Sequence, residues 1–310
     1  MPRELDPSLN ERAFIHQALR DGLRLDGRGF EDYRPVALAF GDEYGVADVQ
    51  LGNTRVFAKA SAEVTVPYAD RPFDGIFAIV TELSPMASPA FEAGRPSETE
   101  VLLSRLLEKT VRRSGALDTE SLCLAAGQTC WSVRVDVHVL AHDGNLVDAS
   151  CLAVVAALRH FRKPETSVEG GLLTVYTPAE REPVPLSWLH SPFCVTFSFF
   201  GTGDGAAADD ADYAHHADDA ATALVDATLL EEQTRIGSCT ISLNRHGEIC
   251  QIAKLGGAPV EAVSLLKCTQ VALDKARDLS TLVDEKLAED AKRRDKGGLI
   301  AELLSAENTR

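Results

Sequence analysis

The sequence predicts an α+β fold in which two similar halves each run from β-strands into a helix, with a long helix near the C-terminal end. Three observations support this class. Strand-like alternation of apolar and polar residues occurs within residues 36–60, and a second strand-rich region follows from Leu172 to Lys254. A nearly all-apolar helical segment runs from Asp148 to about Arg162. A second helical pattern runs from about Pro259 towards Lys292.

Composition limits the possible functions. The chain has 310 residues, of which 45% are hydrophobic, so it is long enough to bury a substantial core. The longest apolar run, Cys151 to Leu158, is too short to cross a membrane, and the first residues are charged, so we expect a soluble protein outside the secretory route. The net charge of −16 argues against a non-specific nucleic-acid binder. Any contact with RNA must therefore be local.

The cysteines and histidines do not form a metal-binding pattern. There are seven cysteines, an odd number, with no C-x-x-C pair, which favours buried thiols in a reducing compartment. His138 and His142 have H-x-x-x-H spacing, but they straddle the end of a predicted strand instead of sharing one helical turn. We expect no metal ion and no cofactor.

The first half begins with a predicted helix and a meander. A capping-box pattern at Ser8 to Glu11 and a stop at Gly22 define an N-terminal helix. Turn residues then separate predicted strands, which we expect to form an antiparallel meander followed by two more strands: 36–40, 46–51, 54–60, 76–80 and 131–140.

A helix predicted from Ser97 to about Arg113 has two different faces. A second capping-box pattern starts this helix, and Gly115 stops it. Its predicted buried stripe consists of Leu102, Leu103, Leu106, Leu107 and Thr110. Basic residues recur at helical spacing on another face, at Arg105, Lys109 and Arg112. This face could bind an anionic partner, or it could be a solvated face paired with Glu98, Glu108 or acids of a neighbouring subunit.

The second half contains predicted strands at 172–176, 194–200, 240–244 and 249–254 before the long helix. Residues 201–221 include six aspartates and no lysine or arginine, so we expect a disordered surface insertion there. The expected organisation is a helical arm (1–30), a first half (31–165), a second half (166–290) and a charged C-terminal tail (291–310).

Several phrases of the sequence resemble the RNase PH family, and within it the ring subunits of the eukaryotic RNA exosome. They include R-L-D-G-R at 24–28, P-Y-A-D-R-P-F at 67–73, V-R-R-S-G-A-L-D at 111–118 and C-V-T-F-S-F-F at 194–200. The resemblance implies an RNase PH fold with duplicated β-α halves, like the second domain of ribosomal protein S5. It also implies a ring of six RNase PH-like subunits around an RNA channel, with KH- and OB-type cap subunits and an attached nuclease as further partners.

The resemblance also implies that the phosphorolytic site is lost. Active relatives carry a Gly-Gly-(Thr/Ser)-Arg loop at a helix start, where backbone N–H groups and the arginine hold phosphate. The corresponding residues here run from Leu146 to Cys151 and contain neither glycine nor arginine. Asp226 aligns with one family aspartate, but the later acidic position falls at Ile236 or Gly237. We therefore expect no catalytic residues.

The resemblance assigns RNA contact to the basic helix face, at Arg105, Lys109, Arg112 and Arg113, and to the loop that carries Arg71. It implies a non-catalytic subunit that guides single-stranded RNA for 3′-to-5′ processing and decay in the nucleus, nucleolus and cytoplasm. Two alternatives remain at this point. The chain could be an active phosphate-dependent exoribonuclease, or an interaction protein that does not contact RNA.

Overall fold

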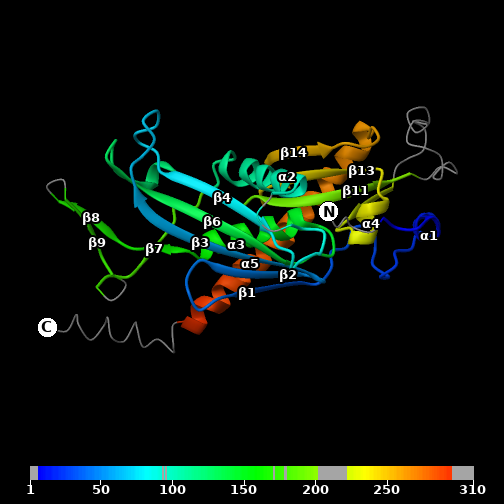
Figure 1. The fold of residues 1–310 in the computed structure, drawn as a ribbon, viewed down its shortest axis with the longest axis horizontal. Coiled ribbons are helices and arrows are strands. Elements are labelled where there is room, and N and C mark those ends of the chain that lie inside the picture. The colour runs from blue at the N-terminus through cyan, green and yellow to red at the C-terminus, as the bar shows by residue number, and fades with distance from the viewer. Residues whose placement is uncertain are drawn as a thin grey trace.

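The computed structural model describes residues 6–92, 94, 96–169, 172–177, 180–201 and 222–294. Within them, two β-sheets lie side by side, with helices packed between and around them (Figure 1). The α+β class with a long C-terminal helix is confirmed. Apart from Gly201, the expected acidic insertion lies outside the described residues, and so do residues 295–310 of the expected tail.

The first sheet has the strand order β1-β2-β3-β6-β4, with the short β5 also paired to β6. Its first three strands form the predicted antiparallel meander, and β6 pairs antiparallel with β3. In contrast, β4 pairs parallel with β6, because the intervening helical segment returns the chain to the same end of the sheet. The strands are β1 (Val36–Phe40), β2 (Val46–Leu51), β3 (Thr54–Thr65), β4 (Ile76–Leu83), β5 (Cys123–Ala125) and β6 (Thr129–Ala141).

Helix α3 (Leu146–His160) lies at the centre of the molecule, as its apolar sequence predicts. It packs on β2, β3, β6 and β11. The alternating valines of β6 point into this core and are fully buried: Val133, Val135, Val137 and Val139. The same core extends to Phe193 and Leu279 of the second half, whose sheet and α5 also enclose a hydrophobic cluster of their own.

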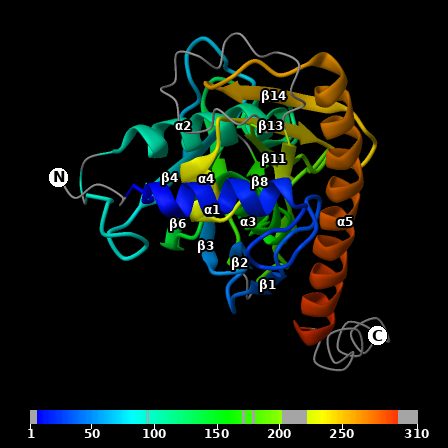
Figure 2. The ribbon, with the colours of Figure 1, turned by 90° about the vertical axis from the view of Figure 1, so that its right-hand side faces the viewer.

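The second sheet is antiparallel and has the order β12-β11-β13-β14. Helix α5 (Ala262–Arg294) packs on its strands and runs the height of the molecule (Figure 2). The strands are β11 (Phe193–Phe200), β12 (Thr222–Val225), β13 (Gly237–Leu243) and β14 (Ile249–Leu255). Two small strand pairs and one short helix complete this part: β7 (Arg162–Lys163) with β10 (Val184–Pro185), β8 (Thr166–Glu169) with β9 (Leu172–Val175), and α4 (Leu229–Thr234). The short helix η2 (Glu120–Leu122) belongs to the first half and precedes β5.

The N-terminal helix α1 (Leu9–Arg20) starts at the predicted capping box. The Ser8 hydroxyl accepts from the Glu11 N–H at 3.3 Å, and the Glu11 carboxylate accepts from the Ser8 N–H at 2.7 Å. These bonds satisfy two donors that the helix cannot satisfy itself. The helix buries Ile15 and Leu19 in a cluster with residues of β11 and β12, and it crosses in front of α4 in Figure 2.

The helix predicted from Ser97 to about Arg113 is not a uniform α-helix. Helix α2 (Glu98–Leu107) begins where the Ser97 hydroxyl accepts from the Glu100 N–H at 3.1 Å, and then continues as a π-helical turn, η1 (Glu108–Arg112). The inclusion of Leu102 in the buried stripe was wrong, because this side chain is 39% exposed. The other four predicted stripe residues are buried.

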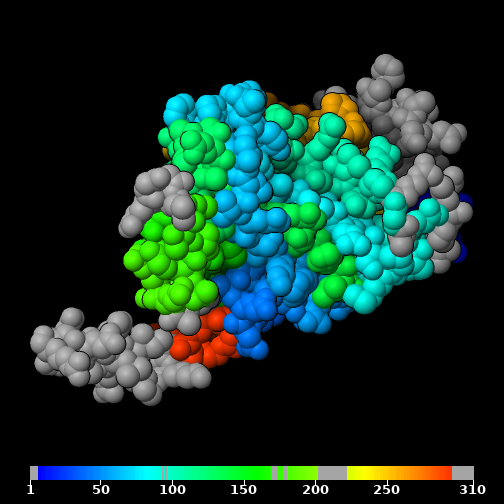
Figure 3. All heavy atoms as spheres, turned by 60° about the vertical axis from the view of Figure 1, so that its left-hand side comes forward, coloured from blue at the N-terminus to red at the C-terminus, as the bar shows by residue number. Residues whose placement is uncertain are grey.

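The C-terminal end of α5 is fixed to the turn between β1 and β2 (Figure 3). The Arg294 guanidinium donates to the carbonyl oxygens of Asp42 and Gly41 and lies over the Tyr44 ring. Buried His160 accepts from the Gly45 N–H at 3.1 Å through Nδ1, so its Nε2 carries the proton and donates to Asp290 at 3.0 Å. Among the described residues, no helix is long and apolar enough to cross a membrane.

Candidate nucleic-acid interface

The basic residues of α2 and η1 form one exposed face, which we call the basic face. It consists of Arg105, Lys109, Arg112 and Arg113, the last of which directly follows η1. Arg112 binds Glu108 at 3.0 Å in a pair whose side chains are both about 40% exposed, so the pair is weak. Within the described part of the chain, the other three form no ion pair. Their charges are therefore available to an anionic partner.

Arg71 lies on a separate loop, residues 66–75, between β3 and β4. The loop backbone is held in place, because the Arg71 N–H donates to the Tyr68 carbonyl and the Gly127 N–H donates to the Pro72 carbonyl. Two aromatic rings nevertheless face solvent, with Tyr68 57% and Phe73 66% exposed. Sequence analysis singled out Arg71 and overlooked these two rings, although both lie in the same P-Y-A-D-R-P-F motif.

The loop and the basic face lie at neighbouring positions on the first sheet. The Thr81 hydroxyl of β4 donates to the carbonyl of Glu100, near the start of α2. The Gly75 N–H, at the end of the loop, donates at 2.9 Å to the carbonyl of Thr119, six residues after Arg113. The chain after α2 thus runs back along β4 towards the loop. The C-terminal end of the basic face approaches the end of the sheet that carries Arg71.

Carboxylates lie at the start of α3, the segment that the sequence resemblance aligns with a phosphate-holding loop. The backbone N–H of Asn145, which precedes the helix, donates to the Glu232 carboxylate at 3.2 Å. Asp148, in the first helical turn, is 4% exposed. Its oxygens accept hydrogen bonds from the Tyr33 hydroxyl, the Asn145 amide, and the Thr196 N–H and hydroxyl.

This arrangement opposes phosphate binding. A helix N-terminus attracts anions through its free N–H groups and its dipole, but here protein carboxylates already lie at that end. Burial raises the pKa of Asp148 to about 6, although hydrogen bonds from Thr196 and Tyr33 favour its ionised form. A phosphate placed beside Asp148 and Glu232 would meet like charges and would find no basic side chain in residues 146–151.

Asp226 serves as a structural acceptor. Its side chain is fully buried, and its backbone adopts φ of 52° in the left-handed region. It accepts from the Arg34 N–H at 2.7 Å and from the Arg34 guanidinium at 2.9 and 2.8 Å. Arg28 and Asn145 donate to it at 2.9 and 2.7 Å. Burial opposes ionisation, but the hydrogen bonds and charge of Arg34 outweigh it and lower the pKa of Asp226.

A neighbouring buried ion pair extends this network. Arg24 donates to the Glu231 carboxylate at 2.7 Å and to the carbonyls of Val225 and Asp226 at 2.9 Å each. The network thus joins the R-L-D-G-R segment, whose Asp26 and Arg28 also bind each other, to the start of α4. The sequence resemblance pointed to Asp226 and to the R-L-D-G-R motif, but it gave no role to Arg24, Arg34 or Glu231.

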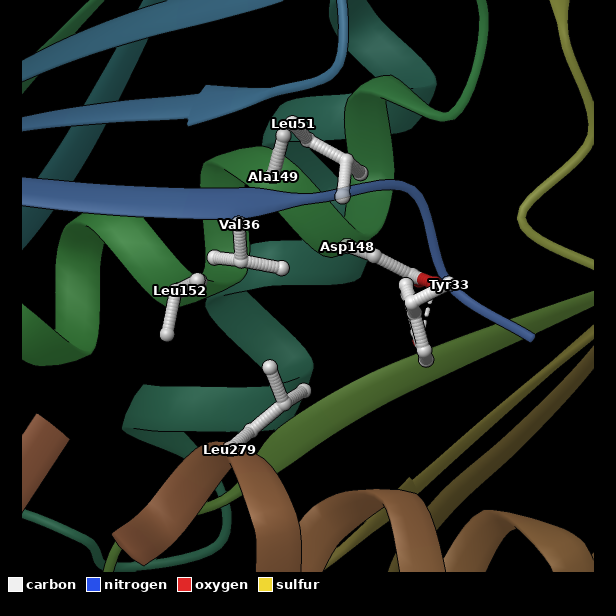
Figure 4. A pocket seen from close by; sticks show the side chains of 7 residues that line it. All are labelled: Tyr33, Val36, Leu51, Asp148, Ala149, Leu152 and Leu279. Atoms are coloured by element: carbon white, nitrogen blue, oxygen red, sulfur yellow. Dashed lines mark hydrogen bonds between the residues drawn. The ribbon is translucent and has the colours of Figure 1, made fainter. Parts of the chain in front are cut away.

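The cavity beside Asp148, shown in Figure 4, is too small for a nucleotide. Its volume is about 10 Å³, which is roughly the space for one water molecule. Its lining is mostly apolar and includes the Tyr33–Asp148 hydrogen bond: Tyr33, Val36, Leu51, Asp148, Ala149, Leu152 and Leu279. In the described ranges, no group of three or more His, Cys, Asp or Glu side chains could hold a metal ion.

Comparison with known proteins identifies the family. Residues 32–164 match domain 1 of the RNase PH 3′ exoribonuclease family, and residues 190–275 match domain 2. The chain therefore belongs to this family, and its fold is the RNase PH fold.

Particular relatives narrow this assignment. The chain is 50% identical over 310 residues to exosome complex component rrp45 of Schizosaccharomyces pombe, with both chains fully covered. It is 45% identical over 311 residues to RRP45 of Saccharomyces cerevisiae, covering 100% of this chain and 99% of that one. A solved Archaeoglobus fulgidus exosome with RNA bound to the active site is 30% identical, with a TM-score of 0.72, covering 88% of this chain and 97% of its own.

Proposed function

We propose that the chain is a non-catalytic ring subunit of an RNA exosome and that its basic face guides single-stranded RNA. The observation that carries this proposal is the combination of a basic face on which Arg105, Lys109 and Arg113 form no ion pair among the described residues with a helix N-terminus beside which carboxylates lie. The full-length similarity to exosome complex components supports the assembly part of the proposal.

Electrostatics support a local path for RNA. The chain carries a net charge of −16, so its overall electrostatic field repels phosphates. Arg105, Lys109 and Arg113 are exposed and lack ion-pair partners among the described residues. Arginine can bind phosphate in a bidentate manner, and lysine adds a point charge. A strand of RNA is therefore attracted to this face and repelled from its surroundings.

The loop at 66–75 extends this path. Arg71 supplies a charge, and the exposed rings of Tyr68 and Phe73 offer flat apolar surfaces on which unpaired bases stack. Stacking of this kind accepts every base, which suits a subunit that handles many RNAs. Asp70 and Asp74 lie in the same loop, so stacking rather than charge dominates the contact.

The same proposal excludes phosphorolysis by this chain. Phosphorolysis needs a site that holds inorganic phosphate and stabilises charge on the scissile phosphate. Asp148 of α3 and Glu232 of α4 lie at that position, and the donors around Asp226 are already engaged. The proposed partners are other RNase PH-like subunits, KH- and OB-type caps and an attached nuclease. The proposed compartments are the nucleus, nucleolus and cytoplasm.

The RNA role is tested with Arg105→Glu combined with Arg113→Glu in the assembled complex. Loss of each single-strand phosphate contact weakens binding about fivefold at about 0.1 M salt, so we expect at least about a 25-fold loss for two. The matched control is Lys267→Glu with Lys292→Glu, which makes the same charge change on exposed residues of α5. Equal losses in both variants, or none in the first, would refute the RNA-guiding role.

Assembly and catalysis need separate measurements. Purification of the tagged chain from its native cell, with the intact complex weighed, should recover five other RNase PH-like chains and cap proteins. A homo-oligomer would contradict the ring proposal. The purified complex should also be incubated with RNA and inorganic phosphate. Release of nucleoside diphosphates that disappears on mutating Asp226, in a complex that stays assembled, would establish the exoribonuclease alternative.

A further inference from the structure

The π-helical turn η1 changes the direction in which the end of the basic face points. The Arg113 N–H donates to the Glu108 carbonyl at 3.2 Å. This bond spans five residues, whereas α-helical bonds span four. The turn therefore contains one residue more than an α-helix would accommodate. Everything after it is rotated by roughly 100° relative to an uninterrupted helix.

Helical geometry shows the effect of this extra residue on Arg113. Leu103, Leu107 and Val111 are buried at intervals of four, and Gly115, with φ of 73° in the left-handed region, ends the segment. In a continuous α-helix, Arg113 would lie seven residues after buried Leu106 and within about 20° of its direction. It would then lie at the edge of the buried stripe, between Leu106 and exposed Lys109. With the π-helical turn, Arg113 is exposed beside Arg112.

A buried hydroxyl holds the turn in place. Thr110, in the middle of η1, is 1% exposed. Its Oγ1 lies 3.0 Å from the Ser242 hydroxyl of β13, 3.6 Å from the Cys194 sulfur of β11, and donates to the Gln251 carboxamide oxygen of β14 at 3.3 Å. A threonine inside a helix commonly bonds back to its own helix, but this one bonds to three strands of the second sheet.

We propose that Thr110 is a positioning residue for RNA binding: its bonds to the second sheet maintain the π-helical turn that keeps Arg113 on the basic face. This inference rests on the proposed function and names a residue that does not itself touch RNA. A π-helical turn is a rare conformation that requires tertiary support, and the hydroxyl network of Thr110 supplies that support.

The test replaces Thr110 with valine, which keeps the shape and removes the hydroxyl, and with serine, which keeps the hydroxyl. In the assembled complex at about 0.1 M salt, Thr110→Val should weaken binding of single-stranded RNA about fivefold, the effect of one lost phosphate contact. The slope of log affinity against log salt concentration should become shallower by about 0.7. Thr110→Ser should restore both quantities to near the wild-type values.

A double-mutant cycle separates positioning from a general loss of stability. Arg113→Ala should weaken RNA binding in the wild-type background and have little further effect in the Thr110→Val background. If the two effects simply multiply, or if Thr110→Ser behaves like Thr110→Val, the positioning role is wrong. If Arg105→Glu with Arg113→Glu has no effect in the wild-type background, the proposed RNA-guiding function itself fails. The two failures are therefore distinguishable.

Discussion

Replacing Asp226 with asparagine tests whether the network around it is structural. Asparagine has nearly the same shape and tolerates the left-handed backbone conformation at this position, so the substitution removes charge without forcing the backbone to change. It leaves the guanidinium groups of Arg34 and Arg28, whose side chains are 6% and 13% exposed, without their shared carboxylate. Loss of one partner from a buried ion pair costs about 3–5 kcal/mol, and we expect a loss of this size.

The assay is urea-induced unfolding of the purified chain at pH 7, followed through the fluorescence of buried Trp131. Because the pKa of Asp226 is lower in the folded chain than in the unfolded chain, the Asp226 carboxylate makes its full contribution to the free energy of unfolding at neutral pH. This contribution is lost only on acidification below about pH 4. The control is Asp143→Asn, which removes a partly exposed carboxylate 3.5 Å from Arg34 and should cost at most about 1 kcal/mol. Equal stability of Asp226→Asn and the wild type would refute the structural role.

Three further predictions concern packing, backbone conformation and pH. Leu106→Ala should lower the free energy of unfolding by about 2–5 kcal/mol, because Leu106 is buried. Leu102→Ala, on the exposed side of α2, should lower it by less than about 1 kcal/mol. Urea-induced unfolding measures both free energies. Gly144→Ala should cost at least about 1–3 kcal/mol in the same assay, because φ is +80° and a Cβ would lie 2.6 Å from backbone atoms. Burial lowers the pKa of His160, so the stability that neutral His160 contributes to the fold should be lost as pH falls below about 6.5. Hydrogen-exchange protection of residues 286–294 should then decrease. Unchanged protection at pH 5 would contradict this.

Local sequence signals predicted most of the elements correctly. The capping box at Ser8 marks the start of α1, and the alternating valines of residues 133–139 mark a strand with one buried face. These features depend on neighbouring residues, so the sequence contains them directly. The parallel pairing of β4 with β6 could not be predicted in the same way, because it depends on how the intervening chain packs.

The candidate site was predicted less completely, for a related reason. The exposed basic residues follow from helical spacing, but the π-helical turn depends on Thr110 meeting Ser242 and Gln251, more than 130 residues away. The burial of Asp226 depends on arginines about 190 to 200 residues earlier in the chain. An alignment position alone made Asp226 resemble a catalytic remnant, whereas its five hydrogen bonds define it as a structural residue.

Helix α5 has a mechanical consequence for the proposed role in guiding RNA. Its 33 residues span about 50 Å, from the second sheet to the turn beside β1, where Arg294 ties it down. A helix that packs on the second sheet and is tied to the first at its C-terminal end resists bending between the two sheets. In the proposed role, tension in an RNA strand drawn across one half would be transmitted to the other without opening a hinge. Passage of the RNA would then be accommodated by side chains at the surface, while the body of the subunit keeps its shape.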